Sequence, residues 1–449
     1  MRNTLTMLCI LVASLTGYSQ EKSFNLNHYK FPDYKRHELE LNFSSWGYMN
    51  KETYNIFNSS GIMEQRDYKS SRNNSSLNFG YQYDNLTRKH IDFLTSTLSG
   101  DYQYTMSKDY SEKDVQSNPS LRWSINGFKK YYLTENKFFV EGLTDLDFSW
   151  NKSKRTLTNI PDEIHNQNYQ SLSVGLGIGV GRIEKVSDLW QAYYILEKLN
   201  KQGSFNRPLE EQDVYEFAKL SSRLKNRRFF DVRLHKIEEL KGLDSLLHQQ
   251  GLIRESDISY FTTLNDYWNF GDFHERQSGV EFLVQASPNY RRASLKTGND
   301  KAVVSQRSSI VSRAEFTYTK QLNLFWERSV GASVSYESLM DSTGNYFYDT
   351  PDDKYFTNAY LSYGYYPNSR TAIYGSISYQ GDNIVILNTQ NNTEDSWRNM
   401  ASFHLSGNYY FSPQLQVAAN VNFDYTDKNN SSLDKFNTYY NVVLRYAIF

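Results

Sequence analysis

The stretch from Ser171 to Arg182 alternates strictly between apolar side chains and small or absent ones. Its apolar positions are Leu172, Val174, Leu176, Ile178 and Val180, and the positions between them are Ser171, Ser173, Gly175, Gly177, Gly179 and Gly181. Successive side chains of a strand point to opposite faces, whereas a helix repeats every ~3.6 residues and loses about 1 kcal/mol per glycine. The stretch therefore predicts a strand with one hydrocarbon face and one nearly bare face.

The same alternation recurs along most of the chain. The other alternating segments begin near His37, Leu77, His90, Leu121, Phe138, Val280, Ile310, Trp326, Tyr355, Ile373, Phe403, Leu415 and Tyr440. With the glycine-rich segment as the sixth, they predict about 14 antiparallel strands, six over residues 37–182 and the rest over residues 272–449. We expect the even count to close a cylinder without exposed edges, with long polar loops after the odd-numbered strands.

Between residues 183 and 271 the apolar period changes from that of a strand to that of a helix. The helical positions are Leu189, Ala192, Leu196 and Leu199, then Val214, Phe217, Leu220 and Leu224, then Phe230, Leu234, Ile237, Leu240 and Leu247, then Phe261, Leu264 and Trp268. Gly203, Gly251 and Gly271 end three of these runs, and Pro208 stands before the second. The pattern predicts a helical insert between the sixth and seventh strands.

The apolar faces of the strands belong either to the core of a soluble sandwich or to a membrane barrel that faces lipid. Segments of about 10 residues are long enough to cross a bilayer at a tilt, and short turns alternate with longer connections. Tyrosine and tryptophan recur near strand ends, at Trp150, Tyr336, Tyr365, Tyr379, Tyr409 and Tyr446. These features favour lipid contact, because aromatic side chains gather at membrane interfaces.

Residues 1–20 have the layout of a secretory signal peptide, with Arg2, an apolar run from Leu5 to Leu15 and a small-residue exit at Gly17 and Ser19. A short N-terminal core helix is the alternative. The single cysteine of the chain, Cys9, lies inside the apolar run. The mature chain would then have no thiol, which excludes disulfides and cysteine-ligated metals. Residues 21–36 are polar and read as a periplasmic leader.

The charge balance does not alter these predictions. The 49 Lys+Arg and 50 Asp+Glu residues give a net charge of −1, and no basic stripe indicates a nucleic-acid partner. No phosphate-binding loop or metal-binding histidine pair is present, so the sequence predicts no cofactor and no enzyme. An outer-membrane hydrolase that uses His404, which shares a strand face with Ser402, Ser406 and Asn408, is the outlying alternative.

The signal sequence, the alternating strands and the final segment from Tyr439 to Phe449 resemble the outer-membrane β-barrel proteins of Gram-negative bacteria. The resemblance implies a location in the cell outer membrane, contact with its lipid, and a terminal aromatic on the apolar face. This sequence departs from that last pattern, because its better apolar face ends at Ile448 and Arg445 shares the face of Phe449. The resemblance is one of architecture and names no substrate.

Two sets of charged residues are candidate functional groups. The set expected to line a lumen constriction is Arg122, Glu141, Asp145, Asp147, Arg182, Arg313, Glu315 and Glu327. A basic group in the insert, expected to dock a periplasmic or outer-membrane protein, contains Arg223, Arg227, Arg228 and Arg233, with Lys225 among them. Paired lumen charges and a solvated helix face are the corresponding alternatives without function.

Three functions follow from these expectations. The first is porin- or transporter-like passage of small polar solutes, with residues 183–271 as a periplasmic plug or docking module. The second is a structural or assembly component with a closed lumen, and the third is the hydrolase. We also expect part of the insert to pack beside the bare glycine strip of the sixth strand, with a freely hanging module as the alternative.

Overall fold

A computed structural model describes residues 29–57, 63–109, 112–134, 137–226, 232–253, 255–270, 275–344, 353–368, 371–387, 393–412, 415–428 and 435–446. The predicted signal peptide and the C-terminal residues 447–449 lie outside the described residues. The terminal aromatic pattern expected at Phe449 therefore remains a prediction.

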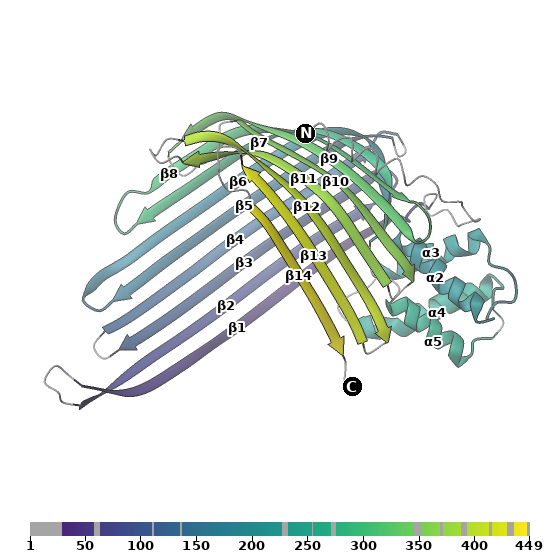
Figure 1. The fold of residues 1–449 in the computed structure, drawn as a ribbon, viewed down its shortest axis with the longest axis horizontal. Coiled ribbons are helices and arrows are strands. Elements are labelled where there is room, and N and C mark those ends of the chain that lie inside the picture. The colour runs from purple at the N-terminus through teal and green to yellow at the C-terminus, as the bar shows by residue number, and fades with distance from the viewer. Residues whose placement is uncertain are drawn as a thin grey trace.

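The described chain forms six strands, four helices and then eight strands (Figure 1). The first six strands are β1 (Tyr34–Phe57), β2 (Met63–Leu86), β3 (His90–Asp109), β4 (Glu112–Tyr132), β5 (Phe138–Leu157) and β6 (Ile160–Lys185). The helices are α2 (Ser187–Lys201), α3 (Glu211–Lys225), α4 (Val232–Gln249) and α5 (Ile258–Phe270). The last eight strands are β7 (Gln277–Thr297), β8 (Val303–Gln321), β9 (Trp326–Thr343), β10 (Asp353–Asn368), β11 (Thr371–Leu387), β12 (Thr393–Ser412), β13 (Leu415–Lys428) and β14 (Lys435–Tyr446).

All fourteen strands belong to one antiparallel sheet in sequence order. The register places apolar side chains opposite each other, as in Leu146 with Leu172 and Ile178 with Val284. This shared face is open to the surroundings, since Leu176 and Ile178 are 71% and 68% exposed. The predicted fold class is confirmed: about fourteen antiparallel strands with one hydrocarbon face and a helical insert between β6 and β7.

The two edges of the sheet do not meet. Among the described residues no pairing joins β1 to β14, and Figure 1 shows a strongly curved wall that is open between them. The expected closure of the cylinder was therefore wrong for this structure. An even number of strands makes the two edge strands antiparallel, but it does not make them equal in length. β1 has 24 residues and β14 has 12.

The long polar loops expected after the odd-numbered strands are largely strand instead. Residues 44–57 continue β1 and pair with residues 63–76 of β2, so the connection itself is only residues 58–62. The sequence concealed this extension because the apolar alternation ends after Phe43 while the hydrogen-bonded ladder does not. The hairpins thus continue well beyond the segments that carry the apolar alternation.

The helices build a hydrophobic core that also includes Leu86, Leu324 and Tyr366 at the adjoining end of the sheet. Its fully buried side chains include Leu189, Leu196, Phe217, Leu243 and Leu264. Most of these are the positions that the helical period predicted, although polar residues such as Gln191 and Ser222 are buried with them. Within the described part of the chain, none of the helices has the length and apolar character needed to cross a bilayer.

Two glycines flank the insert, Gly181 near the end of β6 and Gly279 near the start of β7. Gly181 and Gly279 have φ values of +97° and +143°, and a Cβ at either would lie 2.0 or 2.1 Å from the carbonyl oxygen of Val280 or Arg182. A side chain at these positions would meet both an unfavourable backbone conformation and a clash with backbone that cannot move aside. Glycine is therefore required where β6 ends and β7 begins.

We predict that Gly181→Ala lowers the free energy of unfolding by about 2–3 kcal/mol, because the substitution adds strain at a positive φ and a backbone clash. Urea unfolding of the refolded protein, followed by its gel mobility without boiling, measures the change. Gly142→Ala is the matched control, since a Cβ there meets nothing within 4 Å. Equal unfolding midpoints for the two variants would contradict the prediction.

Candidate functional site: the polar wall and its rim

The face opposite the hydrocarbon carries paired charges. On β4 and β5, Arg122 Nε donates to Asp147 Oδ2 at 3.1 Å, and Asn126 Nδ2 donates to Asp145 Oδ2 at 3.4 Å. Both pairs lie on the polar face, because Leu121 and Trp123 alternate with them toward the hydrocarbon side. On this part of the wall the charged side chains are therefore bonded to neighbouring side chains, which partly neutralise their charge.

A second group of charges crosses from β4 to β7. Lys130 lies between two carboxylates, forming an ion pair with Glu141 at 3.6 Å and a hydrogen bond with Glu281. On β8, Arg313 and Glu315 form an ion pair of 2.7 Å. Lys130 and Glu281 were not among the predicted lumen residues, although their alternation with apolar neighbours was the available signal.

Six of the eight predicted constriction residues thus lie on the same stretch of wall, from β4 to β8. They are Arg122, Glu141, Asp145, Asp147, Arg313 and Glu315. Their ion-pair partners are on the same or neighbouring strands. The arrangement is a band of alternating charge along one side of the wall, which differs from opposite charges facing each other across a narrow pore.

The other two predicted residues lie at the end of the sheet from which the insert emerges, here called the helical rim: the ends of β6 and β10, the start of β9 and the turns after β2 and β8. The buried Arg182 donates to the carbonyl oxygens of Thr87 and Arg88 at 2.9 and 3.0 Å. Glu327 accepts from Gln321 Nε2 at 2.6 Å. Both side chains tie rim segments together instead of lining the middle of the wall.

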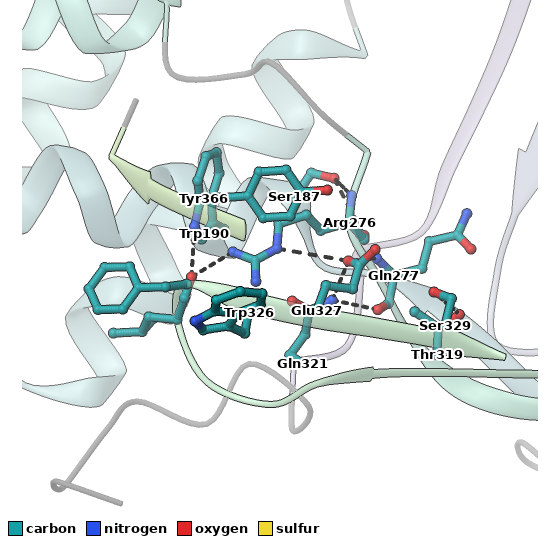
Figure 2. A network of polar contacts seen from close by, with 12 residues as sticks. Ser187, Trp190, Arg276, Gln277, Thr319, Gln321, Trp326, Glu327, Ser329 and Tyr366 are labelled. Carbon is teal, nitrogen blue, oxygen red and sulfur yellow. Dashed lines mark hydrogen bonds and ion pairs between the residues drawn. The ribbon is translucent and has the colours of Figure 1, made fainter. Parts of the chain in front are cut away.

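Arg276 attaches the insert to this rim. Its guanidinium is 0% exposed and donates to the carbonyl oxygen of Leu324, in the turn after β8, at 2.7 Å. The guanidinium carbon lies 5.2 Å from the centre of the Trp190 ring and 4.9 Å from that of the Tyr366 ring. Figure 2 shows the guanidinium between these rings and Glu327, with which it forms an ion pair of 3.9 Å. Burial lowers the pKa of Arg276 to about 10, against the opposing effect of Glu327, so the guanidinium remains charged at neutral pH.

The first helix of the insert adds two more bonds to the rim. Trp190 Nε1 donates to the same Leu324 carbonyl at 3.1 Å, and Tyr194 OH donates to the carbonyl oxygen of Tyr366 at 2.9 Å. Buried carbonyl groups need hydrogen-bond donors, and the insert supplies them to the carbonyl oxygens of Leu324 and Tyr366 at the rim. The roles of Trp190 and Arg276 were not predicted, because an aromatic residue on a helical face is typical of an ordinary core and the partners of both residues are distant in sequence.

The segment before β1 also packs on the insert. Tyr29 stacks on Tyr215 with centroids 6.2 Å apart, and its hydroxyl lies 3.4 Å from that of Ser222. The carbonyl oxygen of Phe31 accepts a hydrogen bond from Arg88, which also donates to Glu184 at 2.7 Å. Burial, the largest effect, raises the pKa of Tyr29, so its hydroxyl stays neutral. The insert is therefore held to the start of β1 as well as to β6, β8 and β10.

The glycine strip of β6 does not receive the insert, and that expectation was wrong. The atoms nearest to a Cβ added at Gly175, Gly177 or Gly179 belong to β5 and β7, chiefly to Phe139, Leu283 and Ser287. Larger side chains on the neighbouring strands fill the space that the missing side chains leave. The alternative of a freely hanging module also differs from the structure, because the insert is bonded to the rim.

The predicted basic group of the insert is only partly described. Arg223 is exposed on α3, while Lys225 pairs with Asp188 at 2.8 Å and lies 5.8 Å from the Trp268 ring. Arg227 and Arg228 lie outside the described residues, and the side chain of Arg233 is not described. Docking through this group stays a prediction, with Lys225 already used inside the insert.

Within the described residues, no three histidine, cysteine, aspartate or glutamate side chains are arranged to hold a metal ion. His404 forms a hydrogen bond with the amide of Asn422 on the next strand. A hydrolase needs a nucleophile with an adjacent base, and the contact between His404 and Asn422 is not such a pair.

An antiparallel wall of fourteen strands, with one hydrocarbon face and one polar face, is the architecture of Gram-negative outer-membrane β-barrels. The cell outer membrane is the environment in which such a wall is stable, and its lipid is the partner of the hydrocarbon face. No protein-family model and no curated protein sequence matches the chain.

Solved outer-membrane β-barrel structures are similar to this chain at low identity. The ferric yersiniabactin uptake receptor of Yersinia pestis is 9% identical with a TM-score of 0.40, over 88% of this chain and 50% of that chain. A loop-deleted OmpT, an outer membrane protein of Vibrio cholerae, is 9% identical with a TM-score of 0.24, over 91% and 99% of the two chains. A mutant of the TodX monoaromatic hydrocarbon channel is 9% identical with a TM-score of 0.26, over 93% and 91%. This chain therefore spans half the length of the receptor.

We predict that Arg276→Ala loosens the insert from the rim at a cost of about 2–4 kcal/mol, because it removes the bond to Leu324 and leaves Glu327 buried without its cation. Hydrogen exchange of residues 187–201 measures the loosening, and the exchange should become faster while that of β3 and β4 is unchanged. Arg223→Ala, an exposed arginine of the same insert, is the control. Equal exchange in both variants would show that Arg276 does not anchor the insert.

We predict that acid loosens the start of α3. Partial burial acts to raise the pKa of Asp213, but hydrogen bonds from Arg207 at 2.7 Å and from the Glu210 N–H at 3.0 Å outweigh it and lower the pKa. Because the folded pKa lies below the ordinary value of 3.8, this stabilisation is complete above that value and is lost as the pH falls through the folded pKa.

Hydrogen exchange of residues 211–215, corrected for the intrinsic rate at each pH, tests this dependence. Asp213→Asn should cost about 1 kcal/mol of local stability at neutral pH and should remove the acid-dependent change. The prediction fails if the native protein and the variant lose protection equally as the pH falls.

Proposed function

We propose that the protein provides an outer-membrane path for small polar solutes, with the insert as a fixed docking platform at the periplasmic mouth. The observation that supports this proposal is the band of paired charges on β4 to β8, opposite a hydrocarbon face. A wall that separates lipid on one side from charged groups on the other offers water and polar solutes a route along the charged side.

The contacts of the insert favour a platform over a plug. Its described bonds run to the turn after β8, to the end of β10 and to the segment before β1. The glycine strip in the wall is filled by strand side chains instead. A module that is held at the rim leaves the charged band uncovered, and it presents residues such as the exposed Arg223 to a partner.

The second candidate is a structural or assembly component, and the unpaired edges of β1 and β14 favour it. An open edge within a bilayer leaves backbone groups without partners, so both edges need other strands, either each other or those of another chain. In that function the insert would brace the wall while the edges are joined to a partner.

We predict that the full-length protein conducts ions in planar bilayers and that Asp147→Asn shifts its selectivity toward anions. Removing this carboxylate leaves Arg122 unneutralised on the wall, and one added charge changes the permeability ratio by about two- to fivefold. The matched control is the double variant Asp147→Asn with Asn151→Asp, in which the second substitution restores one negative charge on the same strand.

The reversal potential in a salt gradient measures this shift. The passage proposal fails if correctly folded protein, identified by its heat-modifiable gel mobility, conducts nothing, and that outcome supports the assembly component. If the protein conducts but Asp147→Asn leaves the ion selectivity unchanged, the proposal that the path runs along the charged band fails.

A further inference from the structure

Three aromatic side chains of β1 face the polar side of the wall. The hydrocarbon positions of β1 are the odd-numbered Leu39, Leu41 and Phe43, so the even-numbered Trp46, Tyr48 and Tyr54 lie on the opposite face. Trp46 and Tyr48 are 53% and 56% exposed. Aromatic side chains that anchor a barrel in lipid lie on the hydrocarbon face, so interfacial anchoring does not account for these rings.

The position of the rings keeps them accessible. They lie in the outer half of β1, on the hairpin that continues beyond the apolar positions, and they are paired on one side with β2. Since β14 has 12 residues and β1 has 24, joining the two edges would leave about half of β1 without a neighbour on its other side. This part of the polar face is thus open whether or not the wall closes.

Side chains that can form hydrogen bonds with hydroxyl groups surround the rings. Asn74 lies directly opposite Trp46, and the Arg72 guanidinium lies 5.4 Å from the centre of the Trp46 ring. Ser44 and Ser76 form a hydrogen bond of 2.7 Å on the same face, two pairs further along the ladder. Amide, hydroxyl and guanidinium groups donate and accept at fixed positions around a flat apolar ring.

Nearby acidic groups are already engaged. Glu52 accepts from Asn50 at 2.6 Å, Glu64 pairs with Arg66 at 3.8 Å, and Asp109 accepts from the Tyr54 hydroxyl at 2.8 Å. Only the Glu64–Arg66 pair cancels charge, whereas Glu52 and Asp109 keep their negative charge and would repel an anionic ligand. The face therefore suits a ligand that has many hydroxyl groups, one apolar surface and no negative charge.

We propose that Trp46 and Tyr48 form a stacking platform for a neutral oligosaccharide on the polar face of the β1–β2 hairpin. The apolar face of a pyranose ring packs on the Trp46 indole, and its hydroxyl groups bond to Asn74 and Arg72. The two rings are two residues apart on one strand face, about 7 Å, so the platform takes more than one sugar unit. The binding does not require that the wall conduct, so the proposed passage and this site stand or fall separately.

Isothermal titration of the full-length protein, in a detergent without a sugar headgroup, tests the site. The probes are the neutral hexasaccharides of glucose, mannose, galactose and N-acetylglucosamine, with hexagalacturonate as the acidic comparison. We expect at least one neutral probe to bind with a Kd of about 1 mM or tighter, and Trp46→Ala to weaken it about tenfold or more. Trp46→Phe should restore part of the affinity, because it restores a flat ring.

Tyr102→Ala is the matched control. Tyr102 lies at the same level of the neighbouring β3, across from Ser75, on the opposite face, and is 46% exposed. Its variant should bind as the native protein does. The proposal is overturned if no neutral probe binds, if only the acidic probe binds, or if Trp46→Ala and Tyr102→Ala have equal effects in proteins of equal heat-modifiable mobility.

Discussion

Contact between the outward side chains and hydrocarbon outside the protein is the interaction on which this structure depends. The sheet has almost no core of its own: most of the large buried apolar side chains belong to the helical insert, whereas Leu176, Ile178 and their neighbours on other strands are exposed. Exposed apolar area costs about 25 cal/mol per Å² in water, so a wall of this kind is stable only against lipid. The separation of an apolar and a polar face along the strands follows from that constraint.

The insert supplies a second, independent source of stability. Its core resembles that of an ordinary helical domain and extends to Leu86, Leu324 and Tyr366 at the end of the sheet, where buried polar groups add further contacts. Arg276, Trp190 and Tyr194 satisfy the carbonyl groups of two rim segments, and Arg182 does the same for the turn after β2. Such bonds are directional, so they fix the orientation of the insert as well as its position.

The period of the apolar residues was sufficient to predict the number and order of strands, the place of the insert and the face on which Arg122 and Asp147 lie. It was insufficient for three features. The outer half of β1 continues as ladder without apolar alternation, because hydrogen bonds rather than lipid determine its extent. The rim contacts of Arg182 and Arg276 join residues far apart in sequence, and the meeting of the sheet edges depends on curvature and strand length, which no local pattern encodes.

The most direct test of the account measures what each face of β6 contacts. Single-cysteine variants Leu176→Cys and Ser173→Cys, made after replacing Cys9, the chain's only cysteine, can carry a nitroxide label in protein folded into lipid vesicles. We expect the label at 176 to relax with oxygen dissolved in the bilayer and to be shielded from a water-soluble nickel chelate, and the label at 173 to show the reverse preference. Equal access of the nickel chelate to both labels would contradict the claim that hydrocarbon covers the apolar face.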